Sequence, residues 1–294
     1  MKRGLLLTLL LLSVSIISAQ QKLCFMVGIS DYGNIDDDPE EWSNISGAND
    51  IRMLAPQFEA KGFEIDTLVD QAATYKNIKE GLTRLIAKCN QGDLIYVHFS
   101  CHGQPIEDLD GDEEDGWDEA LIPVDAKLHY EKGVYEGGSH LIDDELEKYM
   151  SLIRHKIGSE GMVYVVLDAC HSGGASRGNE DHIRGTNEGF TSNPDNYYHP
   201  DRTKETNDNF RIATKNGESP IIFIEACRSY QTNREVRDKE TNTWYGSLSY
   251  YINQVISAGN ITKDSSWIES VRNGMANNNS LRKQNMVIES SLDE

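Results

Sequence analysis

The sequence predicts an α/β protein whose mostly parallel sheet is covered by helices on both faces. Short apolar runs rich in Val and Ile alternate along the chain with amphipathic segments of helical period. This alternation is typical of β-α-β units, whose crossover helices pack on both faces of a parallel sheet. Polar residues follow several of the apolar runs directly, and open α/β sheets bind ligands at the carboxyl ends of their strands.

The N-terminal half contains three predicted strands and two predicted helices. Apolar residues at helical spacing indicate helices that stop near Gly62 and Gly92, and compact β-branched or alternating runs indicate strands. In chain order we expect a strand at 23–29, a helix at 49–61, a strand at 63–69, a helix at 75–89 and a strand at 94–99.

The C-terminal half continues the pattern, with one long interruption. We expect a helix at 142–153, strands at 163–167 and 221–226, and helices at 248–256 and 267–275. Residues 174–219 have little apolar periodicity and many Asn, Asp, Gly and Thr residues, which predicts a loop. A loop of this length is either functional or disordered.

Length and charge limit the classes of partner. The 294 residues suffice for one large α/β domain, which we place at 20–294. The formal net charge of -20 makes nucleic acid and anionic membranes unsuitable partners, and it favours basic peptides or divalent cations.

The first 19 residues have the pattern of a secretory signal peptide. Lys2 and Arg3 precede an apolar run at 5–17, and small residues end at Ala19. We therefore expect an exported protein in the periplasm or outside the cell. The five cysteines form no C-x-x-C motif, and an odd count in an exported chain leaves at least one thiol unpaired.

Two strand ends carry a candidate nucleophile and a candidate base. One reads F-S-C-H-G and contains His102, and the other reads L-D-A-C-H-S-G-G and contains Cys170. Parallel strands end at one edge of a sheet, so the two side chains are expected to be close, with His102 activating the thiol. The N–H groups of Gly103 and Cys170 are the candidate oxyanion hole. The alternative is a buried structural cysteine.

With these strand ends, the order of motifs resembles the caspase-like peptidases of clan CD, specifically the metacaspase branch. The further motifs are G-A-N-D at 47–50, G-D-E-E-D-G-W-D-E-A-L-I-P-V-D at 111–125, L-I-D-D-E-L at 141–146, E-A-C-R-S-Y-Q-T-N-R-E at 225–235 and Y-G-S-L-S-Y-Y at 245–251. The resemblance implies a three-layer caspase-like fold with about six strands, in an exported bacterial member. It also implies a monomeric cysteine endopeptidase that uses a Cys170–His102 dyad and cuts peptides after Arg or Lys.

A pocket for a basic side chain is expected beside the dyad. Asp168 lies two residues before Cys170, so both side chains can border one cleft. The resemblance adds Asp50 as a second pocket aspartate and Ser100 as a pocket-wall serine. Paired carboxylates suit a guanidinium, which donates two parallel hydrogen bonds. The alternative for Asp168 is a carboxylate that caps a helix.

The acidic segment at 107–119 has several interpretations. Four acids match the ligand spacing of an EF-hand, but Glu113 stands where such a loop needs Gly, and no helix is predicted before it. The acids at this spacing are Asp108, Asp110, Asp112 and Glu119. The segment is otherwise a solvated loop.

The resemblance suggests a different, regulatory Ca2+ site formed by Asp118, Asp143 and Asp144. Its fourth aspartate is replaced by Arg177 in this chain, which leaves the dependence on calcium open. Clostripain- or gingipain-like proteases of the same superfamily would share the preference for basic residues without calcium. A non-catalytic, caspase-like interaction module is the alternative outside enzymes.

The loop at 174–219 corresponds to the segment that caspase-like enzymes often cut in themselves. Basic residues beside a pocket for basic residues favour self-processing, and an ordinary exposed loop is the alternative. The basic residues considered are Arg177, Arg184, Arg202, Lys204, Arg211 and Lys215.

Overall fold

The computed structural model describes residues 20–36, 38–111, 113, 115–170, 182–186, 188–199 and 208–292. The expected signal peptide at 1–19 lies outside this part of the chain, as do Asp112, Arg177, Arg202 and Lys204. The predictions made for these residues therefore remain predictions. Among the described residues, no helix is both long and apolar enough to span a membrane.

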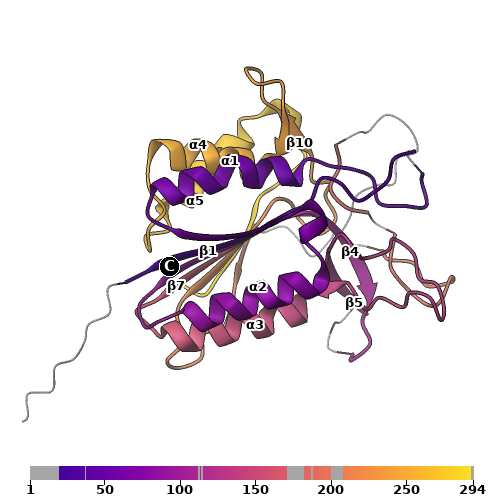
Figure 1. Cartoon of the computed structure of the whole chain (residues 1–294), viewed down its shortest axis with the longest axis horizontal. Coiled ribbons are helices and arrows are strands. Elements are labelled where there is room, and N and C mark those ends of the chain that lie inside the picture. Colours follow the sequence, from indigo (N-terminus) through magenta and orange to yellow (C-terminus); the bar gives the residue numbers. More distant parts are fainter. Residues whose placement is uncertain are drawn as a thin grey trace, which may run out of the picture.

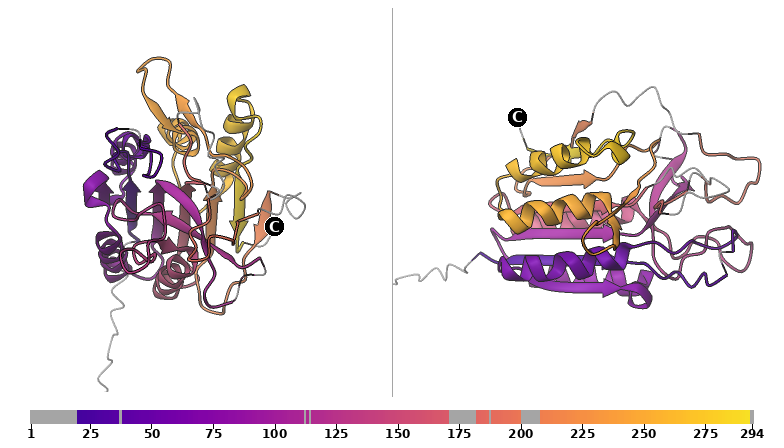
Figure 2. Two further views of the ribbon diagram at one scale, coloured as in Figure 1. Left: turned by 90° about the vertical axis from the view of Figure 1, so that its right-hand side faces the viewer. Right: turned by 90° about the horizontal axis from the view of Figure 1, so that it is seen from above.

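A seven-stranded sheet forms the centre of the molecule (Figures 1 and 2). In spatial order its strands are β2 (Glu64–Val69), β1 (Lys22–Gly28), β3 (Leu94–Ser100), β7 (Met162–Asp168), β9 (Ile221–Glu225), β12 (Val287–Ser290) and β8 (Asn209–Arg211). The first five strands are mutually parallel, β12 is antiparallel to β9, and β8 pairs in parallel with β12. This confirms the α/β fold with a mostly parallel sheet, which has seven strands instead of about six.

Helices cover both faces of the sheet, which gives three layers (Figure 1). One face carries α1 (Gly47–Ala60), α4 (Ser247–Ala258) and α5 (Ser266–Ala276), and the other carries α2 (Tyr75–Lys88) and α3 (Asp143–Ile157). Seen from above, α1, α4 and α5 lie side by side (Figure 2, right). Short 3-10 turns, η1 (Asp70–Ala72) and η2 (Asn279–Leu281), complete the described helical segments.

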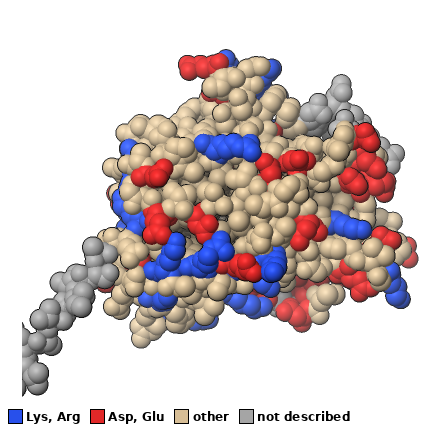
Figure 3. Space-filling model, in the orientation of Figure 1, with Lys and Arg blue, Asp and Glu red and all other residues tan. Residues whose placement is uncertain are grey.

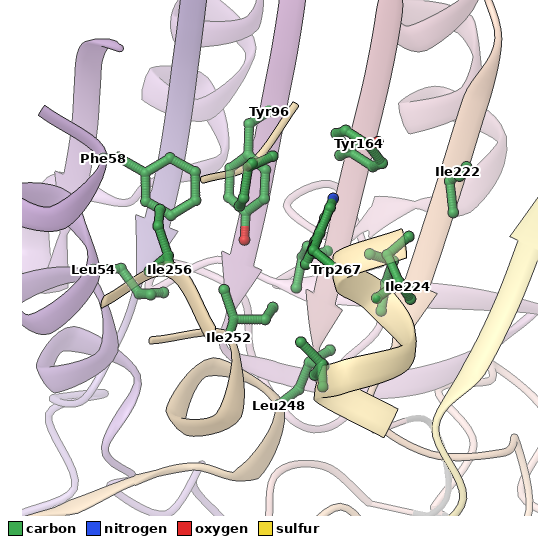
Figure 4. Packing of buried hydrophobic residues seen from close by; sticks show 14 of the residues in the cluster. Leu54, Phe58, Tyr96, Tyr164, Ile222, Ile224, Leu248, Ile252, Ile256 and Trp267 are labelled. Carbon is green, nitrogen blue, oxygen red and sulfur yellow. The ribbon is translucent and has the colours of Figure 1, made fainter. Parts of the chain in front are cut away.

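Alternation along the central strands separates two hydrophobic cores. On β3, Tyr96 packs in the core beneath α1, α4 and α5, whereas Val97 packs in the core against α2 and α3. Tyr164 on β7 faces the same layer of helices as Tyr96, and Figure 4 shows Tyr96 beside Phe58 of α1 and Tyr164 beside Trp267 of α5. The period of two continues to the ends of these strands. Ser100 and Asp168 therefore lie on the face covered by α1 and α4.

Short strands that the sequence pattern did not indicate surround the carboxyl edge of the sheet. They form an antiparallel ribbon of β4 (His102–Glu107), β5 (Trp117–Ile122) and β6 (Leu141–Ile142), and a hairpin of β10 (Glu235–Arg237) and β11 (Trp244–Gly246). The acidic segment at 107–119 is thus partly strand, and it is flanked by strands on both sides. An EF-hand needs flanking helices, so that interpretation is wrong.

The core under α1 generates a prediction for stability. Leu54 of α1 is fully buried among the side chains of Figure 4, whereas Leu152 of α3 is 57% exposed. Leu54→Ala is expected to lower the free energy of unfolding by about 2 to 5 kcal/mol because it leaves a cavity. Leu152→Ala, the matched control, should change it by less than about 0.5 kcal/mol. Urea unfolding measures both, and equal effects would contradict the assignment of this core.

Candidate active site

The two predicted strand ends meet at the carboxyl edge of the sheet. In the parallel pairing of β3 with β7, Ser100 lies opposite Asp168. His102 and Cys170 each follow two residues later, so both leave the sheet at the same place. The candidate base and nucleophile are thereby brought to one edge, as the strand order predicts.

His102 is held as a neutral ring with one free nitrogen. Its Nε2 lies 2.8 Å from the carbonyl oxygen of Ser43, which can only accept a hydrogen bond, so Nε2 carries the proton. The ring lies 4.9 Å from Trp42 and 4.9 Å from Tyr32, centroid to centroid. Burial lowers the pKa of His102 to about 4. Nδ1 has no hydrogen-bond partner in the described part of the chain, so its lone pair is available to accept a proton.

Cys170 is buried at the end of β7 beside a second cysteine. Its thiol donates to the carbonyl oxygen of Gln231 at 2.8 Å, and the thiol of Cys227 donates to the same oxygen at 3.4 Å. A hydrogen bond with Cys170, together with burial, raises the pKa of Cys227 well above its usual range. In this arrangement Cys170 is a protonated thiol, and its proton must leave before the sulfur becomes a nucleophile.

Three buried carboxylates form a pocket on the face of the sheet covered by α1 and α4. Asp50 comes from the first turn of α1, Asp168 from the end of β7, and Glu235 from the start of β10. The hydroxyl of Ser100 donates to Asp50 at 2.5 Å and forms part of the same wall. The expected positions of Asp50, Ser100 and Asp168 are therefore brought together, and Glu235 is an addition.

The pocket contains the side chain of Arg184, which is fully buried. Its Nη1 lies 2.8 Å from Asp50 Oδ2 and 3.5 Å from Asp168 Oδ1. Glu235 Oε1 accepts from Arg184 Nε at 3.0 Å and from Nη2 at 2.9 Å. Nη1 also donates to the Ser100 hydroxyl at 2.5 Å. Every nitrogen of the guanidinium is thus bound to an oxygen of the pocket.

The shared guanidinium governs the ionisation of the pocket. Burial raises the pKa of Asp50 to about 7, although Arg184 opposes the shift. Burial also acts to raise the pKa of Glu235, but Arg184, His182 and Ser46 outweigh it and lower the value to about 2. The three carboxylates more than offset the effect of burial on Arg184 and raise its pKa. A cation in this pocket is therefore strongly favoured.

Polar groups behind Asp168 fix the direction of its carboxylate. Ser249 of α4 donates to Oδ2 from its backbone N–H at 2.8 Å and from its hydroxyl at 2.6 Å. Asn233 donates to Oδ1 at 2.8 Å, and His98 lies 3.0 Å from the Ser249 hydroxyl. Gly246 closes the wall, since a Cβ there would lie 2.2 Å from Asp168 Oδ2. Hydrogen bonds and packing therefore hold Asp168 in place. It accepts from the first turn of α4, as the capping alternative expects, and it also pairs with Arg184.

A second, acidic cavity of about 600 Å3 adjoins Cys170 on the opposite side of the sheet edge, beside α3. Its polar lining is mostly carboxylate, from Glu113, Glu119, Asp143, Asp144, Glu147, Glu225 and Glu289. Burial raises the pKa of Glu119 well above its usual range and that of Asp143 to about 7. A nearby cation would stabilise the charged form of carboxylates in such surroundings.

The three expected calcium ligands lie near this cavity but do not form a complete metal site. Asp118 is on β5 and contributes to the raised pKa of Asp143, so these two carboxylates interact. Asp144 instead pairs with Lys148 at 2.8 Å. Within the described residues, no group of three or more His, Cys, Asp or Glu side chains is arranged to hold a metal ion.

Sequence patterns missed the partners that surround the expected residues. Glu235 lies inside the motif at 225–235, but no local pattern links it to Asp50, which is 185 residues earlier. Trp42 and Ser43, which orient His102, lie in a segment without periodicity. Arg184 was expected only as one of several basic loop residues, and the signal was limited to its charge.

Comparisons with known proteins agree with the order of these motifs. The family model described as "Metacaspase, peptidase C14 domain" matches residues 46–177, which include Asp50, His102, Asp168 and Cys170. Metacaspase-2 of Arabidopsis thaliana is 28% identical over 249 residues, covering 81% of this chain and 53% of that protein. Metacaspase-1B of Aspergillus fumigatus is 35% identical over 102 residues, covering 35% of this chain and 22% of that protein.

The chain spans about half of the Arabidopsis relative and less of the fungal one. A solved structure of a protein from Geobacter sulfurreducens matches the fold with a TM-score of 0.59 at 18% identity, covering 93% of this chain and 94% of that one. The matched region at 46–177 therefore resembles the peptidase domain of metacaspases, and the chain as a whole is similar in sequence to metacaspases of plants and fungi.

Proposed function

We propose that the chain is a cysteine endopeptidase that hydrolyses peptide bonds after Arg or Lys, with Cys170 as nucleophile and His102 as base. The observation that carries this proposal is the burial of an arginine side chain among Asp50, Asp168 and Glu235, beside the edge that bears both dyad residues. A pocket of this charge selects a cationic residue and rejects an acidic one.

The dyad would act through the free nitrogen of its histidine. His102 Nδ1 takes the proton of the Cys170 thiol, and the sulfur attacks the carbonyl carbon of the substrate. The N–H groups of Gly103 and Cys170 stabilise the oxyanion. His102 returns the proton to the leaving amine as the C–N bond breaks, and water hydrolyses the thioester. The low pKa of His102 keeps the ring neutral, and therefore able to accept a proton, at neutral pH.

The charge of the whole molecule supports basic peptides as substrates. The formal net charge is -20, and Figure 3 shows acidic side chains gathered at the end where Figure 1 places β4 and β5. Such a field draws cationic substrates toward the carboxyl edge of the sheet.

We also propose that residues 1–19 direct export and that the mature protein acts as a monomer.

Removing either dyad residue tests the reaction. Cys170→Ala should abolish cleavage of a fluorogenic arginyl peptide, because the substitution removes the proposed attacking sulfur. His102→Ala should lower kcat/KM by about 100- to 10,000-fold. Cys89→Ala, a buried cysteine at the end of α2, is the matched control and should retain activity. Full activity of Cys170→Ala, or cleavage of aspartyl peptides alone, would refute the proposal.

Labelling distinguishes the enzyme from a non-catalytic module. An arginyl peptide with a thiol-reactive electrophile should modify Cys170 in the wild type. A chain that neither reacts with this probe nor cuts peptides after prolonged incubation would be an interaction module instead.

Glu235 is predicted to favour Arg over Lys. Its Oε1 accepts from two nitrogens of the guanidinium, and a lysine ammonium has no group at the position of Nε. Glu235→Gln should therefore lower kcat/KM for arginyl peptides about tenfold or more while changing lysyl peptides less. The ratio of the two rates is insensitive to the folded fraction. Glu218→Gln, which alters a buried carboxylate paired with Arg154, should leave the ratio unchanged.

We further propose that Ca2+ stimulates the enzyme through Asp118, Asp143 and Asp144. The support is the density of carboxylates beside Cys170 and the interaction of Asp118 with Asp143. Bound calcium would neutralise these charges next to the nucleophile.

Metal removal tests this part of the proposal. A chelator should lower the rate of arginyl-peptide cleavage, Ca2+ should restore it, and Mg2+ should not, because Mg2+ needs a tighter octahedral site. Asp118→Asn should weaken the response to Ca2+. Activity that is unchanged by the chelator would favour a calcium-independent, clostripain- or gingipain-like protease.

A further inference from the structure

We propose that Arg184 is the chain's own substrate residue. It occupies the arginine pocket while the chain is whole, and the bond from Arg184 to Gly185 is the one that Cys170 cuts to open the pocket. This inference rests on the proposed peptidase function, and it adds the cleavage site and the latency of the uncut protein.

The first support is how completely the side chain fills the pocket. Arg184 forms ion pairs with Asp50, Asp168 and Glu235 and has no exposed surface. Nη1 also donates to the Ser100 hydroxyl and to the Asp168 carbonyl oxygen. No second arginine or lysine side chain can enter while these contacts persist. A substrate in solution must therefore wait until Arg184 leaves.

The second support is that the backbone around Arg184 is held as a bound peptide strand. Ile183 forms an antiparallel bridge with Arg234. The N–H of Arg184 donates to the Asn233 carbonyl oxygen at 3.1 Å, and the N–H of Glu235 donates to the His182 carbonyl oxygen at 2.9 Å. Extended peptides add to a strand edge through this kind of pairing, and side-chain pockets then supply specificity.

His182 strengthens the attachment on this side of the bond. Its ring stacks on Trp244 with 3.7 Å between centroids and an interplanar angle of 14°. Its Nδ1 lies 3.1 Å from Glu235 Oε2. Glu235 thus holds both the arginine and the residue two positions before it.

The third support is where the chain goes after Arg184. The N–H of Thr186 donates to the Gly103 carbonyl oxygen at 3.2 Å. A Cβ on Gly185 would lie 1.7 Å from the Cys170 carbonyl oxygen and 2.9 Å from that of Gly103. The residue after the arginine therefore lies between the backbone of the candidate nucleophile and that of Gly103, which follows the candidate base on β4. Its φ of 123° also favours glycine at this position.

A permanently buried structural arginine would look different. Arg154 is such a residue: it is buried, pairs with Glu218 at 3.2 Å and donates to the Ser219 carbonyl oxygen at 2.9 Å. It lies on α3, and no chain segment bound to it passes between Cys170 and Gly103. Among the arginines that the structure describes, Arg184 alone combines buried ion pairs with a following residue that contacts the backbone of Cys170 and Gly103.

The cleavage step balances without any further reactant than water. The Cys170 thiol first gives up its hydrogen bond to the Gln231 carbonyl oxygen, and its proton moves to His102. The sulfur attacks the carbonyl carbon of Arg184, the C–N bond to Gly185 breaks, and His102 gives its proton to the new amine. Water then hydrolyses the thioester, which leaves a carboxylate on Arg184 and a free thiol on Cys170. The new chain end is free to leave the pocket.

Intact mass and N-terminal sequencing of the full chain test the assignment. Wild-type protein incubated alone should yield a fragment that ends at Arg184 and a fragment that begins at Gly185, whereas Cys170→Ala should remain whole. The rate at which the wild-type protein cleaves an added arginyl peptide should rise at least about tenfold as this bond is cut, because Arg184 fills the pocket at first. A first cut at another basic residue, or full activity without any cut, would overturn the inference.

Substitutions at the arginine separate latency from catalysis. Arg184→Gln should not be cut at this bond and should cleave the peptide without a lag. Arg184→Lys keeps the charge, and its rate of cleavage at the same bond should be lower than that of the wild type by about tenfold or more. It decides the question if Arg184→Gln fails to fold. The controls are Arg154→Gln, a buried arginine elsewhere, and Arg211→Gln, an exposed residue of β8, and both should be processed like the wild type.

The possible failures are distinct. Equal, lag-free rates for the wild type, Arg184→Gln and Arg184→Lys would refute the latency while leaving the peptidase intact. An absence of both cleavage and probe labelling at Cys170 in every variant would refute the peptidase, and this inference with it.

Discussion

Three carboxylates buried around one guanidinium are the constraint on which the architecture of the site depends. Asp50, Asp168 and Glu235 come from α1, β7 and β10, and each is removed from water. Like charges packed so closely are unfavourable without a cation. Removing one partner of a buried ion pair lowers the free energy of unfolding by about 3 to 5 kcal/mol. Burial raises the pKa of Asp50 to about 7, although Arg184 opposes the shift. The pocket therefore favours a positive charge, from the chain or from a ligand.

The same constraint connects recognition to chemistry through the period of the strands. Ser100 and Asp168 lie opposite each other at the ends of β3 and β7, and His102 and Cys170 each follow two residues later at the same edge of the sheet. A residue bound by the carboxylates thereby has its backbone at the dyad. Burial of His102 between Trp42 and Tyr32 removes its charge and leaves a neutral base. A cation in the pocket and a neutral histidine beside it avoid repulsion between the two.

The sheet edge also separates two acidic regions with different contents. On the side of α1 and α4, the carboxylates are matched to a guanidinium and satisfied by hydrogen bonds from Ser249 and Asn233. On the side of α3, carboxylates such as Glu119 and Asp143 gather at the cavity beside Cys170, and burial raises their pKa values. The proposed specificity pocket and the proposed calcium-binding region thus lie on opposite faces of the same strand end, with the candidate nucleophile Cys170 between them.

The sequence by itself determined the layers of the fold and the edge of the sheet at which the two candidate dyad residues lie. Burial repeats with a fixed period in regular elements such as the strand at 163–167 and the helices at 49–61 and 75–89. The order of apolar and polar residues along the chain is enough to reveal such a period. Because parallel strands end at one edge, Cys170 and His102 could be placed together without coordinates, and the family resemblance added Asp50 and Ser100. Only the tertiary structure decided that Glu235 completes the pocket and that Arg184 fills it. These residues lie on two- or three-residue strands or in irregular segments, where no period exists, and their contacts join positions up to 185 residues apart. Their roles depend on which charges the folded chain buries together, and local sequence carries no record of that choice.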